Sequence, residues 1–218
     1  MKTEVLLDTY PRLFHMAEAG SWDLIKEYGL LSTKATLDKF RVNGELRRSL
    51  EEGHRAEKAT VCGDEGQTVI LRDQKPMPRD RLVKALDAGI SPEDWYLFLN
   101  SKVFTWAQEE RLNRLLNARE YRNHEHDVLV LDSESLIKKY EESVLLCHMN
   151  SGNTFPYPHR RGWDLFKSIG DYAASSKTGK PKKPVAEVVF EYSIPDIKDF
   201  VLEVNRVKGD TVVKKIVL

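Results

Sequence analysis

Two polar residues of types that can do chemistry stand inside otherwise apolar segments of the sequence. His15 lies in Leu13–Ala17, where a buried imidazole needs a hydrogen-bond partner because an unsatisfied polar group costs about 1 to 3 kcal/mol. Glu187 lies in Ala186–Tyr192, where a carboxylate fixed on a strand can oppose positive charge without rearranging. Glu191 competes with it, since residues four apart share one face of a strand. Each has a structural alternative: His15 as a satisfied core histidine, and Glu187 as a solvent-facing residue of a half-buried strand.

The sequence lacks the motifs of the common nucleotide-binding and hydrolytic sites. It contains no G-x-G, so neither a Rossmann fingerprint nor a kinase glycine loop is present, and it has no P-loop motif. It also has no G-x-S-x-G nucleophile elbow and no H-E-x-x-H zinc helix. The segment His124-Glu125-His126 offers two histidines but no third ligand, and we interpret it as a surface loop. The sequence therefore predicts no metal.

The composition indicates one soluble domain with no overall charge. Of 218 residues, 41% are hydrophobic and 31% charged, which suits a single compact domain over residues 1–218. Lysine plus arginine number 34, as do aspartate plus glutamate, so attraction to a nucleic acid must be local. Two cysteines, Cys62 and Cys147, are too few for a disulfide framework and favour a reducing, cytoplasmic setting. The first residues lack the apolar stretch of a signal peptide, and we expect no membrane partner.

Hydrophobic periodicity predicts an α+β fold in which strands and helices mix without a regular βαβ repeat. Strands are predicted at 13–17, 59–62, 68–71, 103–106, 127–132, 144–147, 186–192, 200–207 and 211–217. Helices are predicted at 21–29, 32–52, 80–88, 91–99, 108–118 and 133–142, the second with a break at Asn43-Gly44. Residues 63–66 are predicted to turn a hairpin. The longest irregular stretch is 155–184, with a short helix at 163–169, and such long loops are commonly functional or disordered.

Three segments, taken in order, resemble the ADP-ribosyltransferase superfamily. They are Leu13–Ala17, Val103–Trp106 and Ala186–Phe190, which are similar to that superfamily's histidine strand, aromatic strand and glutamate strand. The likeness extends to DarT-type DNA ADP-ribosyltransferases through Gly29-Leu30-Leu31 and Ile194-Pro195. The chain also resembles a set of small bacterial proteins that share Asp94-Trp95-Tyr96, Asn150-Ser151-Gly152 and Arg161-Gly162.

The resemblance implies two small, mainly antiparallel sheets that form a cleft, with flanking helices. NAD would be the co-substrate, and breaking its nicotinamide bond would develop an oxocarbenium-like charge that Glu187 would oppose. His15 would bind the adenosine-side ribose, and Arg72 would also bind NAD. Phe104 and Trp106 would either stack near the nicotinamide or serve as core aromatics.

Two positions depart from the superfamily pattern. Ala17 stands two places after His15, where the superfamily usually has a threonine. The catalytic arginine of the superfamily can be matched by Arg41, Arg47, Arg48 or Arg72.

The function that the resemblance implies is transfer of ADP-ribose from NAD to a macromolecular acceptor, with DNA or RNA as a candidate. In such proteins the loop before the glutamate strand commonly recognises the acceptor. Here that loop carries Arg160, Arg161, Lys180, Lys182 and Lys183, beside aromatic rings. Cations hold phosphates while aromatic rings stack unpaired bases, but the same composition suits a solvated, flexible loop. The alternative functions are an NAD-dependent RNA 2'-phosphotransferase, an NAD glycohydrolase and a non-catalytic interaction domain that retains the fold.

Overall fold

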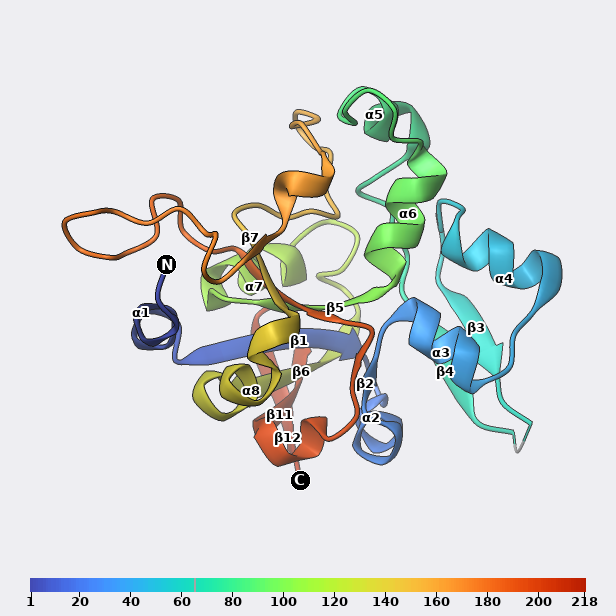
Figure 1. The fold of residues 1–218 in the computed structure, drawn as a ribbon. Coiled ribbons are helices and arrows are strands. Elements are labelled where there is room, and N and C mark those ends of the chain that lie inside the picture. Colours follow the sequence, from blue (N-terminus) through green and yellow to red (C-terminus); the bar gives the residue numbers. More distant parts are fainter. Residues whose placement is uncertain (65) are drawn as a thin grey trace.

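The computed structural model describes residues 1–64 and 66–218, and within them eight strands form one sheet (Figure 1). In spatial order the strands are β12 (Thr211–Ile216), β11 (Val201–Lys208), β6 (Glu125–Asp132), β1 (Arg12–Glu18), β5 (Lys102–Trp106), β9 (Glu187–Glu191), β7 (Val144–Cys147) and β8 (Lys167–Ser168). Every neighbouring pair in this sheet is antiparallel. The α+β class predicted from the sequence is confirmed.

The sheet consists of two halves that meet at one pair of residues. β1 pairs with β6 along its whole length, and β5 pairs with β9 along its whole length. Between the halves, the register of β1 with β5 is limited, among the described residues, to Phe14 opposite Trp106. The structure therefore has one large sheet where the resemblance implied two small ones, and this sheet is only weakly joined between β1 and β5.

Helices cover both faces of the sheet, which explains why β1 is apolar on both sides. Successive residues of a strand point to opposite faces. Leu13 accordingly packs in one cluster with Leu136 of α8 (Ser133–Tyr140), and Leu6 of α1 (Thr3–Thr9) joins the same cluster. Phe14 packs in another with Leu112 of α7 (Glu109–Leu116). The histidine at position 15 therefore shares the face of Leu13.

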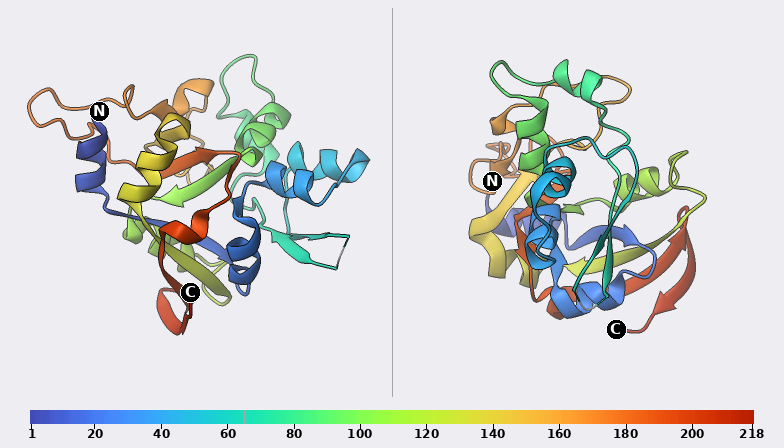
Figure 2. Two further views of the ribbon diagram at one scale, coloured as in Figure 1. Left: turned by 60° about the horizontal axis from the view of Figure 1, so that its bottom comes forward. Right: turned by 90° about the vertical axis from the view of Figure 1, so that its right-hand side faces the viewer.

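A small lobe lies beside the sheet and consists of α3 (Thr33–Lys39), α4 (Gly44–Glu51) and the hairpin of β3 (Ala59–Cys62) and β4 (Thr68–Leu71) (Figures 1 and 2). Its own cluster of buried residues is Leu37, Leu50, Val61 and Leu71. The hairpin predicted from the sequence is confirmed, although residue 65 of its turn lies outside the described residues.

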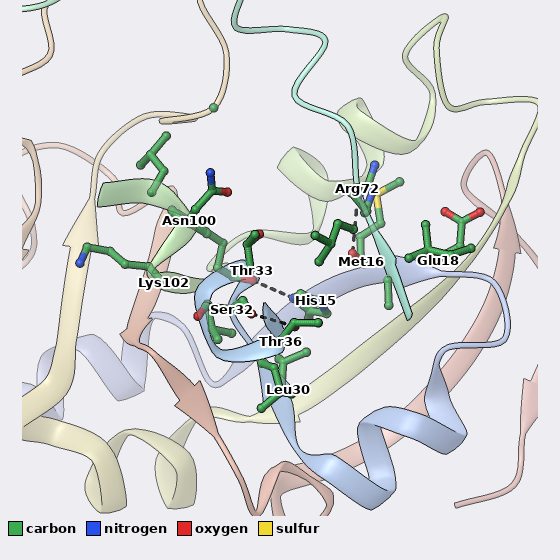
Figure 3. Close-up of a pocket in the computed structure, with 18 of the residues that line it drawn as sticks. His15, Met16, Glu18, Leu30, Ser32, Thr33, Thr36, Arg72, Asn100 and Lys102 are labelled. Carbon is green, nitrogen blue, oxygen red and sulfur yellow. Dashed lines mark hydrogen bonds between the residues drawn. The ribbon is translucent and has the colours of Figure 1, made fainter. Parts of the chain in front are cut away.

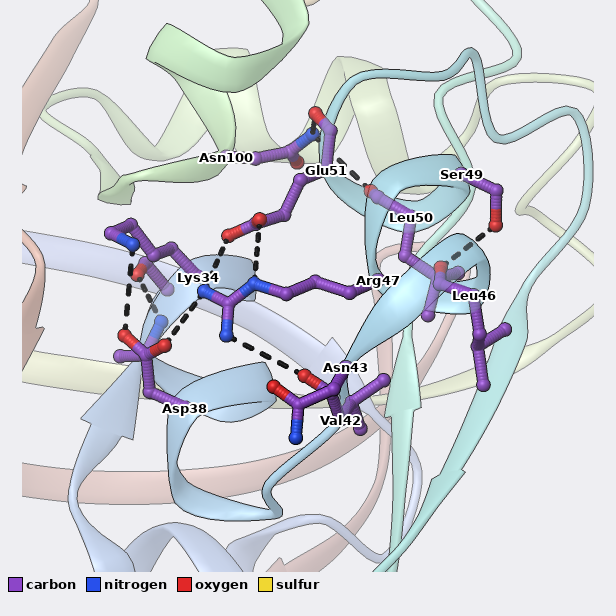
Figure 4. A network of polar contacts seen from close by, with 12 residues as sticks. Lys34, Asp38, Val42, Asn43, Leu46, Arg47, Ser49, Leu50, Glu51 and Asn100 are labelled. Carbon is purple, nitrogen blue, oxygen red and sulfur yellow. Dashed lines mark hydrogen bonds and ion pairs between the residues drawn. The ribbon is translucent and has the colours of Figure 1, made fainter.

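The predicted break between α3 and α4 is also confirmed. Arg41 and Gly44 both have positive φ, 53° and 67°, which ends one helix and starts the other at a new angle. Arg47 of α4 then ties the helices together, because its guanidinium donates to Glu51 at 2.9 Å and lies 2.6 Å from an Asp38 oxygen on α3 (Figure 4). The arginine is thus part of the frame of the lobe.

The remaining elements are short and lie between or beside those already described. They are α2 (Trp22–Tyr28), β2 (Leu30–Leu31), α5 (Arg79–Val83), α6 (Pro92–Asn100), β10 (Ser193–Ile194) and the 3-10 turns η1 (Glu141–Ser143), η2 (Trp163–Leu165) and η3 (Ile197–Phe200). Two predicted helices are shorter than expected: 80–88 ends at Val83, and 163–169 is a single turn followed by β8. None of the helices in the described residues is long and apolar enough to cross a membrane.

Candidate functional site

A pocket of about 370 Å³ lies where β1 and β5 part, with the lobe on its other side (Figure 3). This volume falls in the range of roughly 300 to 1,000 Å³ that is usual for small-molecule sites. The residues that the resemblance assigns to NAD come from β1, β5 and β9 and from the end of the hairpin, and all of them line this pocket: His15, Arg72, Phe104, Trp106 and Glu187. The structure therefore brings together side chains that lie up to 172 positions apart in sequence.

Glu187 is a buried carboxyl group with one oxygen satisfied and one free. The residue is only 4% exposed to solvent. The backbone N–H of Ser151 donates to Oε1 at 3.1 Å, while Oε2 is buried without a partner among the described residues. Burial raises the pKa of Glu187 to about 7, against the opposing effects of the Ser151 hydrogen bonds and of the positive charge on Arg161. A buried oxygen without a partner beside a pocket is a place where a ligand can donate a hydrogen bond.

Glu191, the competing carboxylate, lies outside the pocket. It is directly opposite Lys102 in the β5–β9 register, and both of its oxygens accept hydrogen bonds from the Lys102 ammonium at 2.8 Å. Its carboxylate is therefore already paired at the other end of the strand. Of the two glutamates, the structure places Glu187 at the pocket.

His15 is satisfied on one side of its ring and available on the other. Its Nδ1 lies 2.8 Å from the carbonyl oxygen of Phe104, across the gap between β1 and β5 (Figure 3). Burial, together with a smaller effect of the charge on Arg72, lowers the pKa of His15 to about 4, so the ring is neutral at pH 7. Because a carbonyl only accepts, the single ring proton must be on Nδ1, and Nε2 is an acceptor. The two interpretations of this residue are therefore compatible: it is hydrogen-bonded within the fold and it also lines the pocket.

Of the four arginines that could match the superfamily's catalytic arginine, the structure places Arg72 at the pocket. Its guanidinium lies over the Tyr121 ring, 4.9 Å from the centroid, and Nη1 makes a long contact of 3.5 Å with the Met16 carbonyl. Its Nε is buried without a partner among the described residues. The other three stand elsewhere: Arg47 is engaged within the lobe, and Arg41 and Arg48 are exposed.

Arg55 is a pocket residue that the sequence did not reveal. It is 9% exposed, and its guanidinium donates to the carbonyl oxygen of Arg72 at 3.1 Å, to Asn100 Oδ1 at 2.9 Å and to Thr33 Oγ1 at 3.3 Å. Burial lowers its pKa to about 10, so it stays charged at neutral pH. Within the described residues, neither Arg55 nor Arg72 forms an ion pair with a carboxylate. The carboxylate of Asp73, which lines the same pocket, raises the pKa of Arg55, so this wall carries two cations and one anion, and its net positive charge is favourable to an anion.

Comparison with known families gives one match. A family model described as a family of unknown function, DUF7002, matches residues 11–201. The chain belongs to the DUF7002 family. No curated protein matches the sequence.

The DUF7002 match begins one residue before β1 and ends at the first residue of β11. It therefore includes the lobe and all the pocket residues described above, and leaves out nearly all of β11 and the whole of β12. The departure at position 17 also lies within it: Ala17 lines the pocket without a hydroxyl. Hydroxyl groups reach the same pocket from α3, where Thr33 accepts from Arg55 and Thr36 donates to the Ser32 carbonyl at 2.8 Å (Figure 3).

The residues expected to bind an acceptor also lie within the DUF7002 match, but they do not form one surface. Arg161 is 0% exposed, so the expectation that it contacts a macromolecule is wrong: the fold uses its guanidinium internally. Arg160 is exposed, and it is ion-paired with Asp87 and Asp164. Lys180, Lys182 and Lys183 are exposed on a loop beside the N-terminus, at the opposite side of the sheet from the lobe (Figure 1).

Two further expectations concern metals. The expectation of a surface loop is wrong for His126, which is the second residue of β6 and is fully buried, with Nε2 3.4 Å from the Tyr121 carbonyl. Among the described residues, no cluster of three or more histidine, cysteine, aspartate or glutamate side chains could hold a metal ion. Cys62 and Cys147 are both free thiols.

Proposed function

We propose that this protein binds NAD in the pocket and transfers ADP-ribose to a macromolecular acceptor, with an ADP-ribosyltransferase-like fold whose cleft opens where β1 and β5 part. The observation that carries the proposal is the buried Glu187 carboxyl, whose Oε2 has no partner among the described residues and which lies beside a pocket that also presents His15 and Trp106.

The chemistry assigned to Glu187 is stabilisation of positive charge. In the transfer, the bond between the ribose carbon and the nicotinamide nitrogen breaks, the electron pair leaves with neutral nicotinamide, and the acceptor forms a bond to the ribose carbon and loses a proton. The ribose carries oxocarbenium-like charge in between. An ionised Glu187 would accept a hydrogen bond from a ribose hydroxyl through Oε2 and oppose this charge. Because Ser151 holds Oε1 in place, the carboxylate would need little rearrangement as the charge develops.

The other residues of the pocket would bind and orient NAD. The acceptor atom Nε2 of His15 suits a ribose hydroxyl, which can donate. Arg72 suits the diphosphate, since a guanidinium binds phosphate oxygens through paired N–H groups and its Nε has no partner among the described residues. Arg55, whose N–H groups are largely used within the fold, would add positive charge nearby. Trp106 lies next to Glu187 and offers an aromatic face to the nicotinamide ring.

The experiment that tests the proposal is to incubate the protein with radiolabelled NAD and separate pools of DNA, RNA and protein. We expect label on one pool, and none when Glu187→Gln replaces the wild type. Nicotinamide release without any labelled pool would indicate an NAD glycohydrolase instead. NAD binding without turnover would indicate a non-catalytic domain. Absence of both binding and turnover would contradict the proposal.

A further inference from the structure

Arg161 is fully buried, and its guanidinium binds three backbone carbonyls of a single segment. Nε donates to the carbonyl of Ser151 at 3.2 Å, Nη1 to that of His159 at 2.6 Å and Nη2 to that of Asn153 at 2.5 Å. All three carbonyls lie in the stretch from Ser151 to Arg161 itself. The planar guanidinium therefore closes this stretch into a loop of fixed shape.

The residue at one end of this loop is also the partner of Glu187. The Ser151 carbonyl accepts from Arg161, while the Ser151 N–H donates to Glu187 Oε1. Ser151 is 1% exposed, and its neighbours Asn150 and Gly152 line the pocket with it. The Asn150 side chain accepts from the Gly152 N–H at 3.1 Å, which fixes the turn locally. Ser151 thus links the Arg161 guanidinium to the Glu187 carboxyl, with one hydrogen bond to each.

The backbone of Arg161 is itself anchored to another part of the chain. Its N–H donates to the Ala85 carbonyl at 2.7 Å, and its carbonyl accepts from the Asp87 N–H at 2.9 Å. Leu86 forms a parallel bridge with Arg161 between these two contacts. The backbone of Arg161 is therefore fixed by the segment after α5, and the guanidinium extends from this anchored position to bind the loop.

We propose that Arg161 is a positioning residue for Glu187: it fixes the backbone at Ser151 so that the Ser151 N–H holds Oε1 and leaves Oε2 without a partner among the described residues. The inference rests on the proposed function for its effect on turnover, but the clamp itself does not depend on NAD. It also gives a role to Asn150-Ser151-Gly152 and Arg161-Gly162, two of the three motifs that carry the resemblance to small bacterial proteins.

The consequence for Glu187 is a change in its ionisation. Besides burial and Ser151, the charged or titratable groups that act on this carboxyl are Arg161, Arg111 and Cys147, the last directly opposite Glu187 in the β7–β9 register. A hydrogen bond to the ionised form favours ionisation, and so does a nearby positive charge. Loosening the Ser151 peptide while keeping the positive charge should therefore make the carboxylate harder to form.

The test is Arg161→Lys in the full chain, with Glu187 titrated by carbon NMR in glutamate-labelled protein. Lysine keeps the charge but cannot bind three carbonyls at once. We expect the Glu187 midpoint to rise by about one pH unit, and turnover of NAD at pH 7 to fall severalfold with a pH profile displaced by the same amount. The matched control is Arg81→Lys, because Arg81 also donates to carbonyls of this same loop, those of Thr154 and Pro156, but has no hydrogen bond to Ser151. It should leave the midpoint unchanged.

An unchanged midpoint in folded Arg161→Lys, or an equal shift in the control, would overturn the inference. If Arg161→Lys does not fold, the inference is tested by NMR on the wild-type protein. The amide signal of Ser151 and the Nε–H signal of Arg161 should both follow the Glu187 titration with one midpoint, and failure of either to do so would overturn the inference. Since these signals need no NAD, the clamp can be confirmed even if no transferase activity is found, and the two failures are distinguishable.

Discussion

Trp106 of β5 lies directly opposite Glu187 of β9, so their side chains share one face of the sheet. Trp106 is also the residue through which β5 pairs with β1, opposite Phe14. Two residues earlier on β5, the Phe104 carbonyl lies within hydrogen-bond distance of the His15 ring and is not part of the pairing register with β1. The carboxylate, the aromatic ring and the imidazole are therefore placed together by the same feature, the junction where the two halves of the sheet part.

The buried Glu187 carboxyl should make folding stability depend on pH. Its pKa is about 7 in the folded protein, compared with an ordinary value of 4.5. Between these values the folded protein keeps a proton that the unfolded chain has lost, so stability falls as pH rises through this window and stays lower above it. The contribution is up to about 3 kcal/mol, from roughly 2.5 pH units at about 1.36 kcal/mol each.

Glu187→Gln should accordingly be more stable than the wild type at pH 8, by up to this amount, and gain much less at pH 5. Urea unfolding at the two pH values measures the difference. Glu191→Gln is the matched control, because that carboxylate is exposed and paired with Lys102. Equal gains at pH 5 and pH 8 would show that Glu187 is not the titrating group.

His15 should contribute to NAD binding as a neutral acceptor. Because its pKa is about 4, NAD affinity should stay constant between pH 5.5 and pH 8 in a Glu187→Gln background, which removes the titration of the carboxyl. His15→Ala should weaken binding about fivefold, as expected for one lost hydrogen bond of about 1 kcal/mol. Calorimetry gives the affinity and thermal unfolding gives the stability. A large loss of stability with unchanged affinity would restore the purely structural role.

Arg72 should bind the diphosphate of NAD. Replacing Arg72 by Gln removes a charge-assisted contact worth about 1.5 to 3 kcal/mol and should weaken NAD binding about 10- to 100-fold. Arg48→Gln is the control, since Arg48 is an exposed arginine of α4 that does not line the pocket. Equal affinities for the two variants would exclude Arg72 from the site.

The lysines of the loop beside the N-terminus should matter only if the acceptor is a nucleic acid. Changing Lys180, Lys182 and Lys183 to Glu should then weaken nucleic-acid binding and flatten its salt dependence, because fewer counterions are released, and leave NAD affinity unchanged. A triple change of Lys208, Lys214 and Lys215, which are exposed on β11 and β12, carries the same charge difference and serves as the control. If both triples act alike, or the parent does not bind at low salt, the acceptor is a protein or a small molecule.

The strands and helices could be predicted from the sequence where periodicity was strong, as in β1 and α7. The helix α1 could not, since its Val5, Leu6 and Leu7 form a continuous apolar run without helical spacing. The strand register could not be predicted either. Alternation places Glu187 and Glu191 on one face of the strand, and they differ in their partners across β5: Glu191 is opposite Lys102, and Glu187 is opposite Trp106.

The functions of the arginines were the least predictable. In the sequence, Arg160 and Arg161 look alike, yet one is exposed and ion-paired and the other is fully buried. Arg161 is buried because backbone carbonyls accept its hydrogen bonds. Every residue has a backbone carbonyl, so the sequence does not show which ones will lie near an arginine. The same holds for Arg55, whose partners lie between 5 and 45 positions away in sequence.

The most direct test of the account is the release of nicotinamide from NAD by the wild type and by Glu187→Gln, measured by chromatography in the presence of the pooled acceptors. The account predicts turnover by the wild type and a loss of about 100-fold or more in the variant, with NAD affinity retained, because a transition-state interaction affects rate more than binding. Equal turnover by the two proteins, or nicotinamide release by neither at saturating NAD, would contradict it.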